Sequence, residues 1–215
     1  MHRELQLTAD GSHTLFIPEM DEHYHSVNGA VQESRHVFIE AGLHRLSKEK
    51  LRILEIGFGT GLNAFLTLLE TDIPVVYYTI ESYPLTSEII QSLNYGECIG
   101  TDKKELFTSL HTSPWNEAVK ITESFTLYKI HGDSNTYALP GDIDLVYFDA
   151  FAPDKQPEMW NQAIFHKLYD SMATGGILTT YCAKGSVRRM MQEAGYSVER
   201  IPGPPGKREM LRATK

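Results

Sequence analysis

The stretch LRILEIGFGTGLNAFLTLLE, Leu51 to Glu70, constrains the fold of this chain more than any other. Its first six residues are mostly apolar and suit a strand buried on both faces, whereas apolar residues recur at helical spacing from Leu62 onward. Between them Gly57, Gly59 and Gly61 can adopt backbone torsions closed to other residues and let a ligand approach without a Cβ in the way. The sequence therefore predicts a strand, a ligand-binding turn and a helix.

The glycine spacing narrows the class of ligand. A phosphate-binding P-loop needs Lys followed by Ser or Thr after its last glycine, where this chain has Leu62 and Asn63. The dinucleotide fingerprint needs Gly or Ala at position 62. Nucleoside triphosphates and dinucleotides are therefore disfavoured, and the remaining pattern is an acid, Glu55, followed by G-x-G-x-G. A tight strand-to-helix corner without a ligand stays an alternative.

From Leu51 onward, strand patterns alternate with helical ones, as in a parallel sheet with crossover helices. Further strands are expected at residues 74–81, 125–134, 143–153 and 175–182, followed by an antiparallel pair formed by YSVERI and REMLRAT. Three of these segments carry an acid at or near the strand end: Glu81, Asp133 and Asp149. In open α/β sheets ligands bind outside the carboxyl ends of the strands, so these acids are candidate site residues.

The first 50 residues differ from the rest. An Asp-Gly pair between two strand-like runs predicts a hairpin, and ESRHVFIEAGLHRL predicts a helix that ends near Lys48. We expect residues 1–50 to form an extension on the substrate side and residues 51–215 to form the main domain.

Composition excludes several classes of protein. A net charge of −8 argues against a protein that coats nucleic acid. The chain shows no run of about 18 apolar residues and no secretion signal, so a cytoplasmic protein without membrane contact is expected. Two distant cysteines predict neither a disulfide framework nor a zinc site, and His23 and His25 lack a paired-ligand motif, so no metal is expected.

Asp149 ends an apolar strand and precedes the short apolar turn AFAP. Burying a carboxylate there is costly without hydrogen-bond donors, which indicates a use for it. The segment is similar to the D-P-P-Y type motif of amino methyltransferases. An aliphatic amine is mostly protonated at neutral pH, and a positioned carboxylate could take its proton before the lone pair attacks a methyl group.

The segment EIGFGTG resembles the first motif of the class I S-adenosylmethionine (SAM) methyltransferases. Longer segments resemble the methyltransferase domain of MnmC, the bifunctional tRNA 5-methylaminomethyl-2-thiouridine biosynthesis protein. They are SVNGAVQESRHVF, EIGFGTGLN, ESYPLT, DAFAPDKQPEMW, SVRRMMQEAGY and KREML, and they span almost the whole chain.

The resemblance implies a Rossmann-like α/β fold with a mostly parallel seven-stranded sheet, a C-terminal antiparallel hairpin and a small N-terminal extension. It implies methyl transfer from SAM to the aminomethyl group of a modified wobble uridine in tRNA, with Asp149 at the methyl acceptor. It places seven residues at SAM: Glu55, Gly57, Gly59, Gly61, Asn63, Glu81 and Asp133. Among these, Glu81 would bind the ribose and Asp133 the adenine, although an Asx turn explains Asp133 nearly as well. It places Lys155, Arg188, Lys207 and Arg208 towards RNA.

The MnmC proteins also carry an FAD-dependent oxidase domain, for which 215 residues leave no room. The aminomethyl substrate is therefore expected from a separate oxidase or another enzyme. Three alternatives remain: an aminopropyltransferase of the spermidine synthase type, a methyltransferase acting on another amine, and a SAM- or RNA-binding module without catalysis. An acidic polyamine channel would distinguish the first of these.

Overall fold

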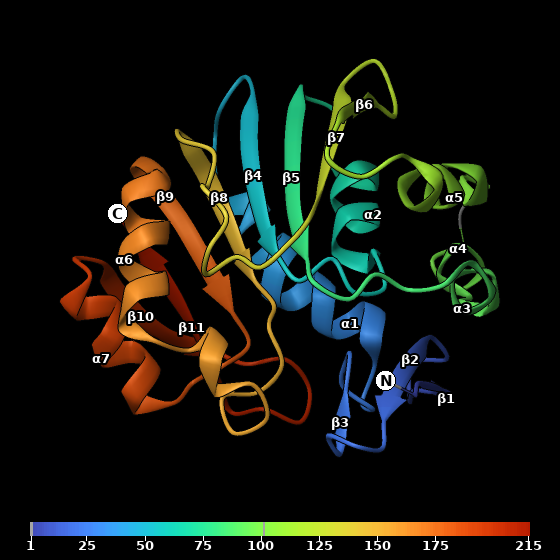
Figure 1. The fold of residues 1–215 in the computed structure, drawn as a ribbon, viewed down its shortest axis with the longest axis horizontal. Helices are drawn as coiled ribbons and strands as arrows, with labels where there is room; N and C mark the ends of the chain where they lie inside the picture. Colours follow the sequence, from blue (N-terminus) through green and yellow to red (C-terminus); the bar gives the residue numbers. More distant parts are fainter. Residues whose placement is uncertain (1, 101) are drawn as a thin grey trace.

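The computed structural model describes residues 2–100 and 102–215. Its centre is an eight-stranded sheet (Figure 1). The strands are β4 (Leu51–Ile56), β5 (Val75–Glu81), β6 (Ala118–Lys120), β7 (Phe125–His131), β8 (Ile143–Phe148), β9 (Met172–Thr180), β10 (Ser197–Pro202) and β11 (Glu209–Thr214). Their order across the sheet is β10-β11-β9-β8-β4-β5-β7-β6.

The five strands β9, β8, β4, β5 and β7 run parallel, and β11, β10 and β6 are antiparallel to their neighbours. The mostly parallel sheet and the C-terminal antiparallel hairpin are thus confirmed. The expected number of strands was wrong by one. The additional strand, β6, has only three residues at the sheet edge and is too short to produce a recognisable alternation.

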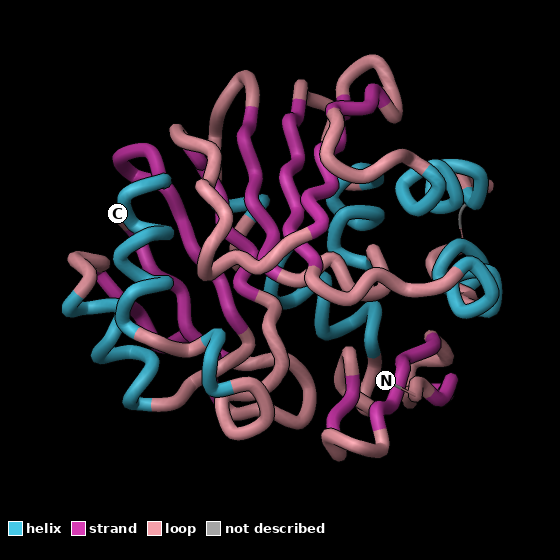
Figure 2. Tube along the Cα trace, viewed as in Figure 1, coloured by secondary structure: helices cyan, strands magenta, loops and turns pink. Residues whose placement is uncertain are grey.

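Helices cover both faces of the sheet, so the protein has three layers (Figures 1 and 2). One face carries α2 (Leu62–Leu69), α5 (Lys104–Thr112) and the π-helix η1 (Arg35–Glu40), and the other carries α6 (Gln162–Ser171) and α7 (Gly185–Glu193). The remaining short helices are α1 (Ala30–Ser34), α3 (Ser87–Ser92), α4 (Tyr95–Cys98) and the 3-10 turns η2 (Leu43–Arg45) and η3 (Pro157–Met159). In the described ranges, no helix is long and apolar enough to cross a membrane.

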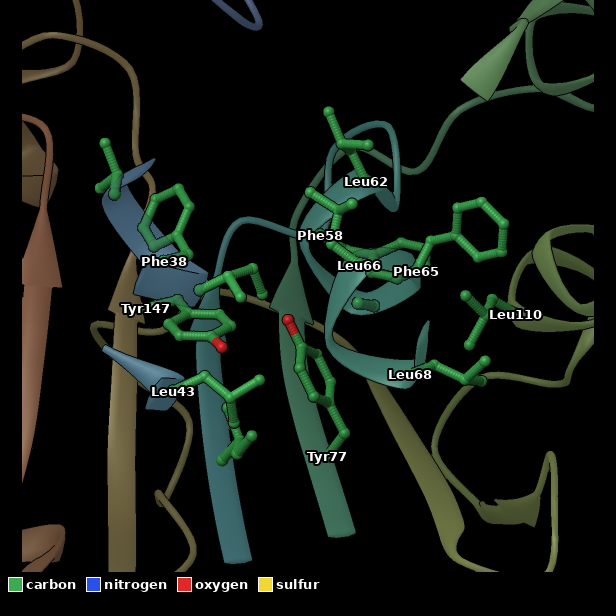
Figure 3. Packing of buried hydrophobic residues seen from close by; sticks show 14 of the residues in the cluster. Phe38, Leu43, Phe58, Leu62, Phe65, Leu66, Leu68, Tyr77, Leu110 and Tyr147 are labelled. Atoms are coloured by element: carbon green, nitrogen blue, oxygen red, sulfur yellow. The ribbon is translucent and has the colours of Figure 1, made fainter. Parts of the chain in front are cut away.

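Two apolar clusters hold these layers together, because successive residues of a buried strand point to opposite faces. Ile53 packs in the cluster under α2, and its neighbour Leu54 packs in the cluster under α6 and α7. In the first cluster Phe38 of η1 lies against Tyr147 of β8, with ring centroids 5.1 Å apart (Figure 3).

The first 50 residues form a three-stranded antiparallel sheet of β1 (Glu4–Leu7), β2 (His13–Ile17) and β3 (Glu22–His23), followed by α1 and η1. This small sheet lies beyond the carboxyl ends of β4 and β5 (Figure 1). The expected helix ends earlier than Lys48. At Gly42 a Cβ would lie 2.6 Å from the carbonyl oxygen of Phe38, so the chain turns there at a position where a side chain does not fit.

Candidate active site

The glycine turn between β4 and α2 has the geometry expected from the sequence. Gly57, Gly59 and Gly61 all have positive φ, at 92°, 50° and 73°. A Cβ on Gly57 would lie 2.7 Å from the carbonyl oxygen of Asp149, and one on Gly61 would lie 2.7 Å from Nε2 of His111. The turn therefore requires glycine both for its torsions and for the close approach of neighbouring groups.

Glu81, at the end of β5, is joined directly to this turn. Its Oε2 accepts from the Gly59 amide at 2.9 Å and its Oε1 accepts from the Tyr83 amide at 2.8 Å. A carboxylate oxygen can accept more than one hydrogen bond, so both oxygens can still accept from the hydroxyls of a ligand. The Glu81 carboxylate thus holds the glycine turn in place and can still accept hydrogen bonds from a bound ligand.

A cavity of about 330 Å³ opens at the carboxyl ends of the parallel strands. Six of the residues predicted from the sequence line it: Gly57, Gly59, Asn63, Glu81, Asp149 and Lys207. Six others do not: Glu55, Gly61, Asp133, Lys155, Arg188 and Arg208. The structure therefore brings together one glycine turn, two acids, one amide and one cation.

Asp149 is half-buried at the wall of this cavity, where its Oδ2 accepts from Nδ2 of Asn63 at 2.8 Å. Desolvation raises the pKa of Asp149 to about 7, and the nearby Glu33 carboxylate acts in the same direction. The Asn63 hydrogen bond and the Lys207 charge lower the pKa but do not offset the burial. At neutral pH this carboxyl group is therefore poised between its two protonation states.

Glu55 lies inside the core and not at the cavity surface. It is fully buried, and its carboxyl oxygens make no hydrogen bond within the described residues, although Thr79, Asn63 and Tyr77 surround it. Burial raises the pKa of Glu55 well above its ordinary value, because an apolar environment disfavours the charged carboxylate. In this position Glu55 lies behind the cavity wall, next to the Asn63 side chain.

Asp133 is exposed, and its Oδ1 accepts from the Asn135 amide at 2.8 Å. This is the Asx-turn geometry that was the alternative to an adenine contact. The next residue, Ser134, is buried and lines the cavity with Met159. At this end of the cavity Ser134, and not Asp133, therefore lines the wall.

A charged cluster of Lys207 and Glu33, with Tyr181 beside it, also faces the cavity, and no sequence motif indicates it. Nζ of Lys207 forms an ion pair with Oε1 of Glu33 at 2.8 Å and lies 3.9 Å from the centroid of the Tyr181 ring. The other Glu33 oxygen accepts from the Ser26 amide at 2.7 Å, and the Tyr181 hydroxyl donates to the Ala150 carbonyl at 2.8 Å. No spacing rule could have predicted this cluster, because its members come from distant segments.

The N-terminal segment supplies another wall of the cavity through Tyr24 and His25. Nε2 of His25 lies 2.6 Å from Oγ1 of Thr60 in the glycine turn, and burial lowers the pKa of His25 to about 4. Tyr24 packs edge-on against Phe151, with ring centroids 5.1 Å apart. In the parts of the chain that the structure describes, no group of acids, histidines and cysteines is arranged to hold a metal ion.

The remaining basic residues expected near RNA lie outside the cavity. Nζ of Lys155 lies 3.4 Å from Oδ2 of Asp21, Arg208 is exposed and Arg188 is half-buried. Lys184 similarly pairs with Asp154. Acids thus pair with two of the basic residues outside the cavity, Lys155 and Lys184.

The cavity residues fit the cofactor that the resemblance implies. The backbone of Gly57 and Gly59 lines the cavity without side chains, Glu81 lines it beside them, and Oδ1 of Asn63 is buried without a partner in the described structure. Hydroxyls and an ammonium group are suitable donors for these oxygens. A SAM molecule bound here would lie between the glycine turn and Asp149.

Comparison with known proteins supports the same assignment. Residues 103–215, slightly more than half of the chain, match a family described as S-adenosyl-L-methionine-dependent methyltransferase. The tRNA 5-methylaminomethyl-2-thiouridine biosynthesis bifunctional protein MnmC of Marinomonas sp. is 30% identical over 208 residues, which cover 89% of this chain and 31% of that protein. The chain thus spans about one third of the length of this relative.

The fold is similar to a crystal structure of MNMC2 from Aquifex aeolicus, with a TM-score of 0.80 and 26% identity over 99% of this chain and 70% of that one. Spermidine synthase from Thermotoga maritima shares the fold alone, at 10% identity and a TM-score of 0.55, over 99% of this chain and 71% of that one. The chain therefore belongs to the S-adenosyl-L-methionine-dependent methyltransferase family and is of the MnmC-like kind.

Proposed function

We propose that this protein transfers a methyl group from SAM to the primary amine of a 5-aminomethyl group on the wobble uridine of tRNA. The observation that carries the proposal is the Asp149 carboxyl group, which lies in the cavity beside the glycine turn and is held by Asn63. The names of the relatives, which specify 5-methylaminomethyl-2-thiouridine biosynthesis in tRNA, support the choice of acceptor.

When bound, SAM supplies an electrophilic methyl group on a sulfonium. The role of Asp149 is to take a proton from the incoming ammonium, which frees the nitrogen lone pair for attack. A pKa of about 7 suits this task, because the carboxylate is present at neutral pH and is basic enough to accept a proton. Asn63 holds one carboxyl oxygen and leaves the other for the amine.

Orientation contributes the larger part of the rate enhancement. Asp149 follows β8 directly, and its backbone amide donates to the Ile56 carbonyl at 3.1 Å, which fixes it beside the glycine turn. Holding two reactants at fixed positions can lower a barrier by roughly 7–11 kcal/mol. The rigid strand ends thus position the amine against the methyl group.

The acceptor nucleotide has to be prepared before this step. We propose that an oxidase supplies the aminomethyl group, because removal of a carboxymethyl group from an amine is an oxidation that methyl transfer does not provide. A tRNA substrate also implies that the protein acts in the cytoplasm.

The lining of the cavity supports a second candidate, aminopropyl transfer to a polyamine. Among the described residues, four carboxyl groups face the cavity, from Glu22, Glu33, Glu81 and Asp149, against the one ammonium group of Lys207. Such a lining suits any cationic acceptor. Two of these acids are already engaged, since Glu33 pairs with Lys207 and Glu81 binds the glycine turn, which leaves fewer carboxylates for a polyamine.

The test uses methyl-labelled SAM with tRNA from cells that cannot make the methylated base, followed by nucleoside mass analysis. We expect labelled 5-methylaminomethyl uridine with the wild type, and a loss of ~10²-fold or more in turnover for Asp149→Ala with little change in SAM affinity. Asp154→Ala is the matched control, because this acid lies in the same loop with 77% of its side chain exposed. Transfer to putrescine from decarboxylated SAM, with no labelling of tRNA, would replace the first proposal by the second.

A further inference from the structure

Lys207 differs from the other basic residues near the cavity because its ammonium group points inward. It lines the same cavity as Asp149, and its charge lowers the pKa of that acid, so the two groups interact electrostatically. Arg208, its neighbour in the β10–β11 loop, is exposed and does not line the cavity. Two consecutive cations thus have different surroundings.

The orientation of Lys207 is fixed by a turn and by a buried partner. Its amide donates to the Pro204 carbonyl at 2.9 Å, and Gly206, with φ of +86°, reverses the chain before it. Its partner Glu33 is only 7% exposed and is itself held by the Ser26 amide. Fixing a lysine side chain costs conformational entropy, so this arrangement differs from that of a mobile surface lysine.

An ammonium group has three N–H donors. One is directed to Glu33, and Tyr181 packs under the charge, which leaves donor capacity towards the cavity. In a uracil substituted at C5, the C4 carbonyl is attached to the neighbouring ring carbon. An amine held at Asp149 therefore brings that carbonyl to the same part of the cavity as Lys207.

We propose that Lys207 donates a hydrogen bond to the C4 carbonyl of the base whose aminomethyl group is methylated, and that it reads uracil rather than contacting a phosphate. The inference rests on the proposed function, because the carbonyl belongs to that acceptor. Cytosine carries an amino group at C4, a donor that meets the Lys207 donor without forming a hydrogen bond. Lys207 is thus a residue that determines base specificity, and Glu33 positions it.

The experiment compares two anticodon stem–loop RNAs, one with 5-aminomethyluridine and one with 5-aminomethylcytidine at the wobble position. We expect the wild type to prefer the uridine RNA in kcat/KM, and Lys207→Met to reduce that preference by about 10- to 100-fold, as for loss of one charged hydrogen bond. Lys207→Arg keeps N–H donors at this position and should therefore retain part of the preference for the uridine RNA. Lys120→Met, on the far edge strand, should leave the preference unchanged.

Removal of the cation alone leaves Glu33 buried and unpaired, so the double variant Glu33→Gln with Lys207→Met is measured as well. The side-chain oxygen of the introduced glutamine can still accept from the Ser26 amide. A loss of preference in both variants, with SAM affinity kept, supports the proposal. Equal preference in the wild type and both variants would overturn it.

A phosphate contact gives a different result. It would lower the log–log salt slope of RNA binding by about one unit in Lys207→Met and leave the base preference intact, which also overturns the proposal. The proposed function is tested separately by wild-type turnover of the uridine RNA. If the wild type does not methylate that RNA, the proposed function and the inference both fail, whereas turnover with an unchanged preference removes only the role of Lys207.

Discussion

Asp149→Asn should change the pH dependence of stability in a way that reports the desolvation of this acid. The substitution keeps the shape of the side chain and an oxygen that can accept from Asn63, but removes the titration. The folded protein raises the pKa of Asp149 from 3.8 to about 7, so the fold favours the neutral form. The stability contributed by proton binding is fully present below pH 3.8 and is lost as the pH rises through 7.

The magnitude follows from the two pKa values. Each pH unit between them changes the unfolding free energy by about 1.4 kcal/mol, so the wild type should lose about 3 kcal/mol relative to Asp149→Asn between pH 5 and pH 8.5. The difference between the two proteins isolates this group, since the other titrating groups are common to both. The stability of Asp149→Asn relative to the wild type should therefore be about 3 kcal/mol higher at pH 8.5 than at pH 5.

Urea unfolding at pH 5, 6, 7 and 8.5, followed by circular dichroism, measures this difference. The slope against urea concentration should agree between the two proteins at each pH, which shows that the same surface is exposed on unfolding. A stability difference that stays constant within about 0.5 kcal/mol across this range would refute the desolvation of Asp149 and its proposed role as a base near neutral pH.

Two other substitutions test the glycine turn. Glu81→Ala removes the acceptor for the Gly59 and Tyr83 amides and should weaken SAM binding by about 10-fold or more while the protein stays folded. Calorimetry measures this affinity, and an unchanged value would remove Glu81 from the cofactor site. Gly61→Ala places a side chain at a φ of 73° with its Cβ 2.7 Å from His111, so it should lower the unfolding free energy by roughly 2 kcal/mol or more in urea unfolding. Gly141→Ala, with open space around it, should change that free energy little. Equal effects of the two substitutions would contradict the geometry of the turn.

The sequence by itself determined the strand, glycine turn and helix at Leu51–Glu70 and the alternation that builds the parallel sheet. These features depend on local periodicity and on torsions that only glycine adopts readily, so they can be read without long-range contacts. The apolar run before Asp149 likewise predicted that this acid ends a strand. The short edge strand β6 could not be predicted, because three residues show no period.

Only the tertiary structure decided which polar residues face the cavity. Glu55 lies two residues before Gly57, yet its position in β4 directs it into the core under α2, and Asn63 faces the cavity beside Asp149. Lys207 and Arg208 are adjacent in sequence, but the ion pair with Glu33 joins residues 174 positions apart. Such contacts depend on how distant segments pack, and that information is absent from any local pattern of residues.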